Sequence, residues 1–127
     1  MAWLRLIGEV LSELLRQKSA DVNARDGVAK ETPLHKSVRL NMVDCTRLLL
    51  RYGADPNIRN AAGETPLHLA ATYLRDLATW NALLGDGGGD LDAKTASGLT
   101  VRDAVVKAKN STATVVIAQF DALRDAA

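Results

Sequence analysis

A four-residue motif occurs twice in this chain, 33 residues apart. The segments Thr32 to His35 and Thr65 to His68 both read Thr-Pro-Leu-His. A second series repeats independently, because the pattern of Ala20 to Arg25 returns at Ala54 to Arg59 and, more loosely, at Gly89 to Lys94. A period of this length is typical of stacked-repeat architectures, in which each unit buries its apolar face only against its neighbours. The sequence therefore predicts one domain built from successive stacked units.

Each Thr-Pro pair is typical of the start of a helix. The side chains of Thr32 and Thr65 can cap a helix, and the proline that follows takes the first helical position, where its missing N–H costs nothing. After the first of these helices, Asn41 is a residue type that tolerates a left-handed turn. The pattern then predicts a second helix from about Val43 to Tyr52, ended by Gly53.

These motifs resemble the ankyrin-repeat family, whose unit is a β-turn or hairpin followed by two antiparallel helices and whose signature includes T-P-L-H-x-A. The strongest stretch is Gly63 to Ala71, and Leu48 to Asp55 closes the preceding unit as the family does. The resemblance implies an all-α solenoid of antiparallel helix pairs joined by β-turn or hairpin loops. It divides the single domain into a partial N-terminal capping repeat (1–26), two repeats (27–60 and 61–95) and a C-terminal capping repeat (96–127).

The first and third units depart from the pattern. Residues 2–18 carry apolar side chains at helical spacing and predict one amphipathic helix without its partner, which either caps the array or marks where a longer array was cut. In the third unit Leu74 and Arg75 stand where the family usually has Gly-His, so we expect its second helix to be displaced. The glycines between Gly85 and Gly89 are expected to form a mobile connection.

The fourth unit keeps the cap residue Thr100, but residues 101–103 replace the Pro, Leu and His of the motif. Asn110 and Ser111 are expected to cap a last helix whose apolar side chains are Val115, Val116, Ile117, Phe120 and Leu123. The run 112–117 by itself favours a strand, so the prediction of a helix there rests on the repeat context.

The sequence gives little support for catalysis, a cofactor or a metal. The resemblance implies that His35 and His68 brace the hairpins through hydrogen bonds to nearby backbone, and no carboxylate or thiol stands at ligand spacing from either. The single Cys45 is expected in the core. Residues 88–95 approach a phosphate-binding loop, but two aspartates would face the phosphates, so only a weak enzymatic alternative survives there.

A protein-binding surface is the remaining prediction. In a stack of this kind the hairpin tips and first helices line a concave face, where equivalent residues form ladders. Arg25, Arg59 and Lys94 form one basic ladder, which would suit an acidic partner or would serve only solvation. The candidate contact residues are these three together with the basic Lys30, Lys36 and Arg39 and the apolar anchors Leu40, Leu69 and Tyr73.

The main hypothesis is therefore a non-catalytic protein-interaction module, an adaptor or an inhibitor. One alternative is a structural fragment of a longer array. A second is an inhibitor of Rel-type transcription factors, because the loop Asn23 to Thr32 is similar in length to one in that subclass. The net charge of +1 argues against a nucleic-acid partner, and the charged residues within 2–15 argue against a signal peptide or membrane span. We expect a monomer in the cytoplasm or nucleus.

Overall fold

The computed structural model describes residues 22–25, 27–85 and 88–126. Within them lie six helices, which form three successive pairs. The pairs are α2 (Pro33–Arg39) with α3 (Val43–Arg51), α4 (Pro66–Tyr73) with α5 (Leu77–Leu84), and α6 (Val101–Ala108) with α7 (Ser111–Ala126). The helix expected at residues 2–18 lies outside the described residues. The all-α class of helix pairs and loops is confirmed.

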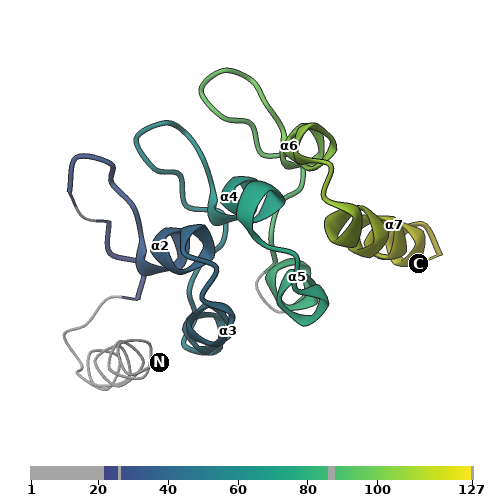
Figure 1. Cartoon of the computed structure of the whole chain (residues 1–127), viewed down its shortest axis with the longest axis horizontal. Coiled ribbons are helices and arrows are strands. Elements are labelled where there is room, and N and C mark those ends of the chain that lie inside the picture. The colour runs from purple at the N-terminus through teal and green to yellow at the C-terminus, as the bar shows by residue number, and fades with distance from the viewer. Residues whose placement is uncertain (1–21, 26, 86–87, 127) are drawn as a thin grey trace.

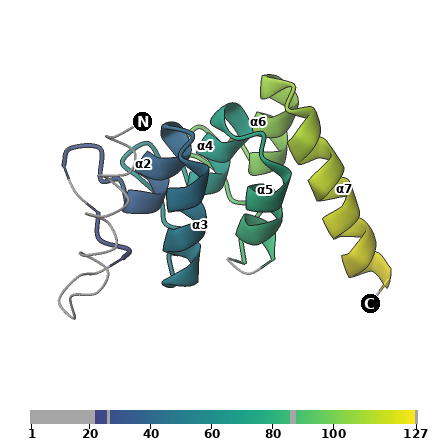
Figure 2. The same cartoon turned by 60° about the horizontal axis from the view of Figure 1, so that its bottom comes forward.

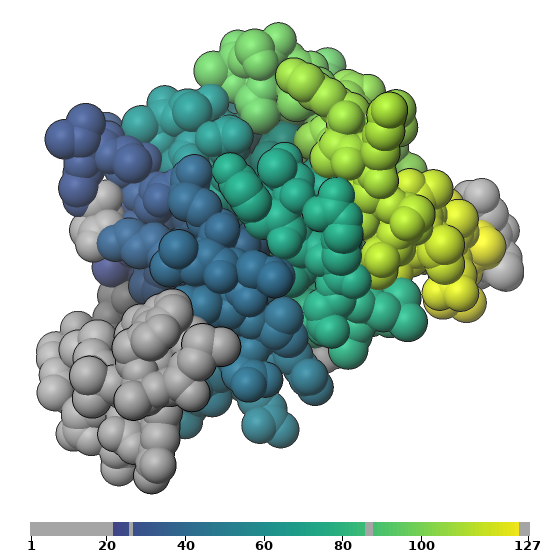
Figure 3. Space-filling model, in the orientation of Figure 1, coloured from purple at the N-terminus to yellow at the C-terminus, as the bar shows by residue number. Residues whose placement is uncertain are grey.

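The helices form two layers. The first helices α2, α4 and α6 stand side by side in one layer, and the second helices α3, α5 and α7 form the other (Figures 1 and 2). Helix α4 packs against both α2 and α6, and α5 packs against both α3 and α7. A long loop precedes each first helix and projects to the same side of the stack (Figure 1). Each unit therefore lies against the next, as the successive colour bands of the space-filling view show (Figure 3).

Threonine begins each of the three first helices. The side-chain oxygens of Thr32, Thr65 and Thr100 each accept a hydrogen bond from the backbone N–H three residues later, and the side chain of that later residue bonds back to the backbone N–H of the threonine. This reciprocal capping box satisfies two backbone donors at once. Proline follows Thr32 and Thr65, as the sequence predicts, and the fourth unit keeps the same cap without proline.

The turns between paired helices differ between units. Asn41 adopts the predicted left-handed conformation (φ 55°), and Lys109 does the same in the last unit (φ 53°). The equivalent residue of the middle pair, Leu74, is extended instead (φ −114°, ψ 121°). Helix α5 accordingly starts one residue later relative to its cap threonine than α3 and α7 do, with Asp76 as its N-cap. This is the displacement that the departure from the pattern predicts.

A continuous apolar core runs through all three pairs. Its largest fully buried side chains include Trp80, Leu34, Leu49, Leu67 and Leu74. The indole Nε1 of Trp80 donates to the carbonyl oxygen of Leu74 at 2.7 Å, so the largest core side chain has its polar atom satisfied. Cys45 is buried as expected, and burial raises the pKa of its thiol.

The last helix buries only some of its apolar side chains. Val116 and Ile117 are buried and Phe120 is partly buried, but Val115 and Leu123 are 52% and 73% exposed. All five residues lie in this helix, as the sequence predicts. Helix α7 packs against α5 and α6, so only the face turned toward those helices is covered.

None of the described helices combines the length and the apolar character that a membrane span requires.

Candidate protein-binding face

Two histidines tie each unit to the next. The Nδ1 atom of His35 accepts from the backbone N–H of Thr32 at 3.1 Å, so Nε2 carries the proton and donates to the carbonyl oxygen of Glu64 at 2.8 Å. His68 repeats the arrangement with Thr65 and with the carbonyl oxygen of Leu99 at 3.0 Å. The predicted bracing role is confirmed, and the braced hairpin is the one that precedes the following helix pair.

The pKa of His35 lies below its ordinary value because burial disfavours the imidazolium. The hydrogen bond to the Glu64 carbonyl opposes this effect, as does the nearby Glu31 carboxylate. A neutral His35 therefore suits both of its contacts, since Nδ1 must stay an acceptor. No cluster of three metal-ligating side chains occurs in the part of the chain that the structure describes.

A polar ladder joins the bases of the hairpins. The Asn23 side-chain oxygen accepts from the backbone N–H of Asp55 at 2.7 Å, and that of Asn57 accepts from the N–H of Asp90 at 2.8 Å. Asp92 holds the equivalent position in the last hairpin, and there its carboxylate accepts from the Arg102 guanidinium at 3.1 Å. The hairpins are thus fixed against one another by contacts that repeat with the sequence period.

The predicted basic ladder lies on neighbouring hairpins. The Arg25 guanidinium donates to the backbone carbonyl of Arg59 at 3.3 Å, which places these two residues side by side. Lys94 lies on the third hairpin, where its backbone forms a bridge with Thr100. All three residues are exposed, and so is Lys30 at a left-handed turn of the first hairpin.

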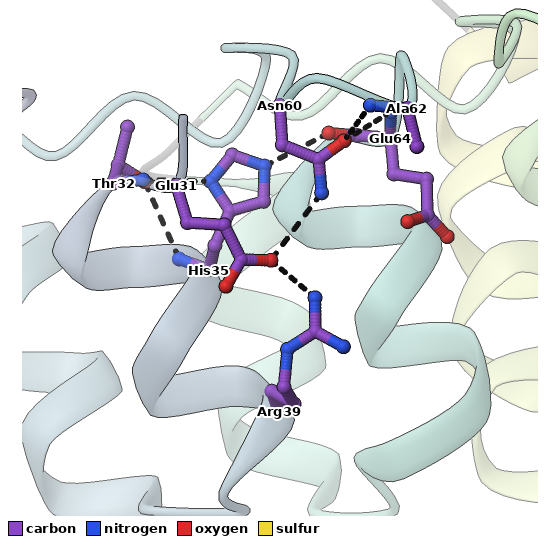
Figure 4. Close-up of polar contacts among 7 residues, drawn as sticks. All are labelled: Glu31, Thr32, His35, Arg39, Asn60, Ala62 and Glu64. Carbon is purple, nitrogen blue, oxygen red and sulfur yellow. Dashed lines mark hydrogen bonds and ion pairs between the residues drawn. The ribbon is translucent and has the colours of Figure 1, made fainter. Parts of the chain in front are cut away.

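Arg39 is held inside a polar network. Its guanidinium pairs with the carboxylate of Glu31, which also accepts from the Asn60 amide at 3.3 Å (Figure 4). The Asn60 side-chain oxygen accepts from the backbone N–H groups of Ala62 and Glu64, both at 3.0 Å. Glu31 is buried, and its hydrogen bond raises the pKa of Arg39. Arg39 therefore connects α2 to the next hairpin through Glu31, a role that no motif in the sequence indicates.

The three apolar anchors separate into two groups. Leu40 and Tyr73 are 61% and 43% exposed, so both are accessible to a partner. Leu69 is only 4% exposed and belongs to the core, so its assignment as a surface contact is wrong. The reason is that Leu69 lies on α4, which has a helix on either side. Lys36, on α2, is exposed.

The structure also shows two grooves that the sequence did not reveal. One, of about 370 Å³, lies between α4 and α6 on the side of the hairpins, and its lining residues are Glu64, His68, Thr72, Thr95, Leu99, Ala104, Lys107 and Ala108. The other, of about 810 Å³, lies between α3 and α5 in the second layer. The sequence signal for both grooves is a set of alanines, because small side chains leave room between neighbouring helices. These are Ala104 and Ala108 in the groove between α4 and α6, and Ala78 and Ala82 in the groove between α3 and α5.

Comparisons with known proteins agree with the repeat pattern. A family model described as ankyrin repeats, in three copies, matches residues 4–95. A protein of Rickettsia bellii named for its ankyrin repeats is 42% identical over 59 residues, which are 46% of this chain and 34% of that protein. The regulatory protein NPR5 of Arabidopsis thaliana is 39% identical over 77 residues, 61% of this chain and 16% of that protein.

A third relative is a homologue of the transient receptor potential cation channel subfamily A member 1 from Caenorhabditis elegans. It is 44% identical over 64 residues, which cover 50% of this chain and 5% of the channel homologue. The matching regions are thus a minor part of each of these three relatives.

Proposed function

The chain belongs to the ankyrin-repeat family, and from that premise we propose that it binds a partner protein through its concave face, without catalysis. The family generally serves protein interaction, and solenoids of this kind use their extended concave surfaces for it. The proposed face consists of the hairpins and the first helices α2, α4 and α6. An adaptor and an inhibitor would both use it in this way.

The observation that carries the proposal is that exposed side chains on this face stand on a braced scaffold. Histidine and asparagine side chains link each unit to the next hairpin, so the face is held in shape before a partner arrives. Arg25, Arg59 and Lys94 then supply positive charge along the hairpins, and Leu40 and Tyr73 supply exposed apolar surface. We propose that the partner presents an acidic surface to the basic ladder.

The test compares two triple charge reversals. Arg25→Glu, Arg59→Glu and Lys94→Glu together should weaken binding to a partner recovered with the wild-type chain, chiefly through a slower association rate. The matched control reverses Arg47, Arg51 and Arg124, which are exposed residues on α3 and α7. Thermal melting should stay close to wild type for both variants. Equal loss of binding in both, or in neither, would refute the basic ladder as a contact.

A second candidate is that the chain acts as one segment of a longer array. It is favoured by the small share of each relative that the matching regions cover. Sedimentation and thermal melting test it, because a cooperative monomer would count against it. The variants Trp3→Asp and Ile7→Asp probe the same question at residues outside the described part. The Rel-type inhibitor alternative continues to rest on the length of the Asn23 to Thr32 loop.

We further propose a cytoplasmic or nuclear setting and a monomeric state. The single thiol of the chain, Cys45, is buried and free, which is compatible with a reducing compartment.

A further inference from the structure

The groove between α4 and α6 has a counterpart one unit earlier, between α2 and α4, and the two differ in what fills them. Counted from the cap threonines, Thr72 is equivalent to Arg39, Ala104 to Leu69, and Ala108 to Tyr73. The space between α2 and α4 is therefore occupied by the Arg39 guanidinium, by the buried Leu69 and by Tyr73, which is close enough to Arg39 to raise its pKa. Smaller side chains at all three positions leave the later groove open, with a volume of about 370 Å³.

A carboxylate stands at the same position in both places. Glu31, immediately before Thr32, accepts from the Arg39 guanidinium and from the Asn60 amide. Glu64, immediately before Thr65, lines the open groove, and no dashed line joins its carboxylate to the Glu31–Arg39 pair in Figure 4. No hydrogen bond or ion pair to the Glu64 carboxylate occurs within residues 22–25, 27–85 and 88–126. The chain therefore pairs the first carboxylate internally and presents the second to the groove.

We propose that the groove between α4 and α6 binds an arginine side chain of the partner protein, with its guanidinium on the Glu64 carboxylate. The Glu31–Arg39 pair is the internal template, because it shows that a guanidinium fits against a carboxylate at this position of the unit. Leu99, Ala104 and Ala108 line the groove and offer apolar surface to the methylene groups of the arginine. The proposal rests on the proposed function, since it assigns one contact within the same concave face.

Two cationic side chains belong to the surroundings of Glu64. Arg39 is near enough for the Glu64 charge to raise its pKa, but its hydrogen bond goes to Glu31. Lys107 lines the same groove and repels a bound guanidinium. An acidic residue beside the partner's arginine would face Lys107 favourably, which is compatible with an acidic partner surface.

The experiment titrates the isotope-labelled full chain with N-acetyl-arginine-N-methylamide and follows its backbone amide signals by NMR. The matched probe is N-acetyl-citrulline-N-methylamide, which keeps the shape of arginine and lacks its charge. The arginine probe should shift the signals of Thr95, Leu99 and Ala104. The citrulline probe should bind more weakly than the arginine probe, by a factor of about five or more. Glu64→Gln should remove this difference, and Lys107→Ala should strengthen binding of the arginine probe.

Thr72→Arg is a further test, because it supplies inside the chain the guanidinium that the partner would supply. This variant should fold normally and lose the response to the arginine probe. The control Asp44→Asn changes a carboxylate that lines the other groove, and it should leave the titration unchanged. Glu64→Gln should keep a melting temperature close to that of the wild type, since the Glu64 carboxylate forms no hydrogen bond or ion pair within the described residues.

Three results would overturn the proposal: equal responses to arginine and citrulline, an unchanged titration of Glu64→Gln, or shifts confined to the groove between α3 and α5. None of these results bears on whether the concave face binds a protein. That question is decided by the charge reversals described above. Failure of the arginine site can therefore be distinguished from failure of the proposed protein-binding function.

Discussion

Replacing Asn110 by alanine should destabilise the protein by about 2 to 3 kcal/mol, because this one side chain joins α7 to α4. Its oxygen caps α7 by accepting from the backbone N–H of Ala113 at 3.1 Å. Its amide group donates to the carbonyl oxygens of Leu74 and Ala71 at 2.8 and 3.1 Å, and the side chain is completely buried. An alanine can make none of these bonds.

The magnitude follows from what each lost bond leaves behind. Loss of an N-cap costs about 1 kcal/mol. The Leu74 carbonyl keeps the Trp80 indole as a donor, so it is not left without a partner. The Ala71 carbonyl loses its side-chain donor in a buried place, which costs about 1 to 2 kcal/mol. The free energy of unfolding from urea denaturation, followed by far-UV circular dichroism, measures the total.

An aspartate at the same position separates the two contributions. Asn110→Asp keeps the capping oxygen but turns a carboxylate toward two carbonyl oxygens, which raises the pKa of the new group in the folded state. Its deficit relative to wild type should therefore be larger at pH 7 than near about pH 4, since the stability of the variant is lost as pH rises from the unfolded-state pKa of the aspartate through its raised folded-state pKa.

Asn81→Ala, which changes an exposed asparagine on α5, should stay within about 0.5 kcal/mol of wild type. A deficit of the same small size for Asn110→Ala would refute the reasoning about α7.

Three further predictions concern the packing of the units. Leu49→Ala should lower the free energy of unfolding by about 2 to 5 kcal/mol, since Leu49 is fully buried, and urea denaturation measures this. Gly63→Ala should cost more than Gly98→Ala in the same assay: both glycines have positive φ, but only at Gly63 would a Cβ meet the backbone of Ala96, at 2.6 Å. The two costs being equal would contradict close hairpin contact. Because the pKa of His35 is lowered in the folded state, the unfolded state binds more protons, so stability should fall as pH drops below about 6.5. His35→Gln should show a smaller fall between pH 7 and pH 5, measured by thermal melting.

The parts of the fold that were predictable from sequence are those decided by local chemistry. Both threonines that precede a proline in this chain begin a helix, and Asn41 takes a left-handed turn because its side chain tolerates one. The repeat context was enough to overrule the strand preference of residues 112–117, which lie in α7. The bracing role of His35 and His68 was implied by the family resemblance. The structure shows that the atoms they bind are the carbonyl oxygens of Glu64 and Leu99.

The surface was harder to predict because it depends on what neighbouring units cover. Leu69 lies on a first helix, which the sequence predicts at the concave face, yet the helices on either side of α4 bury it. Arg39 carries a charge suited to a partner, but a buried glutamate eight residues earlier holds it. The groove beside Glu64 exists because three positions carry small side chains, and a missing volume shows only when the adjacent unit is in place.

The polar ladder at the hairpin bases has a consequence for how such a chain can change its length. Asn57 meets Asp90 through the same bond by which Asn23 meets Asp55. Excision of one whole period would bring Asn23 opposite Asp90, so recombination between gene segments could shorten or extend the protein and still yield a matching junction. An additional repeat would have to be inserted before Thr100. The last unit differs from the others because Arg102 binds both Asp92 and Asp121 there, so the Asn-to-backbone bond is not repeated.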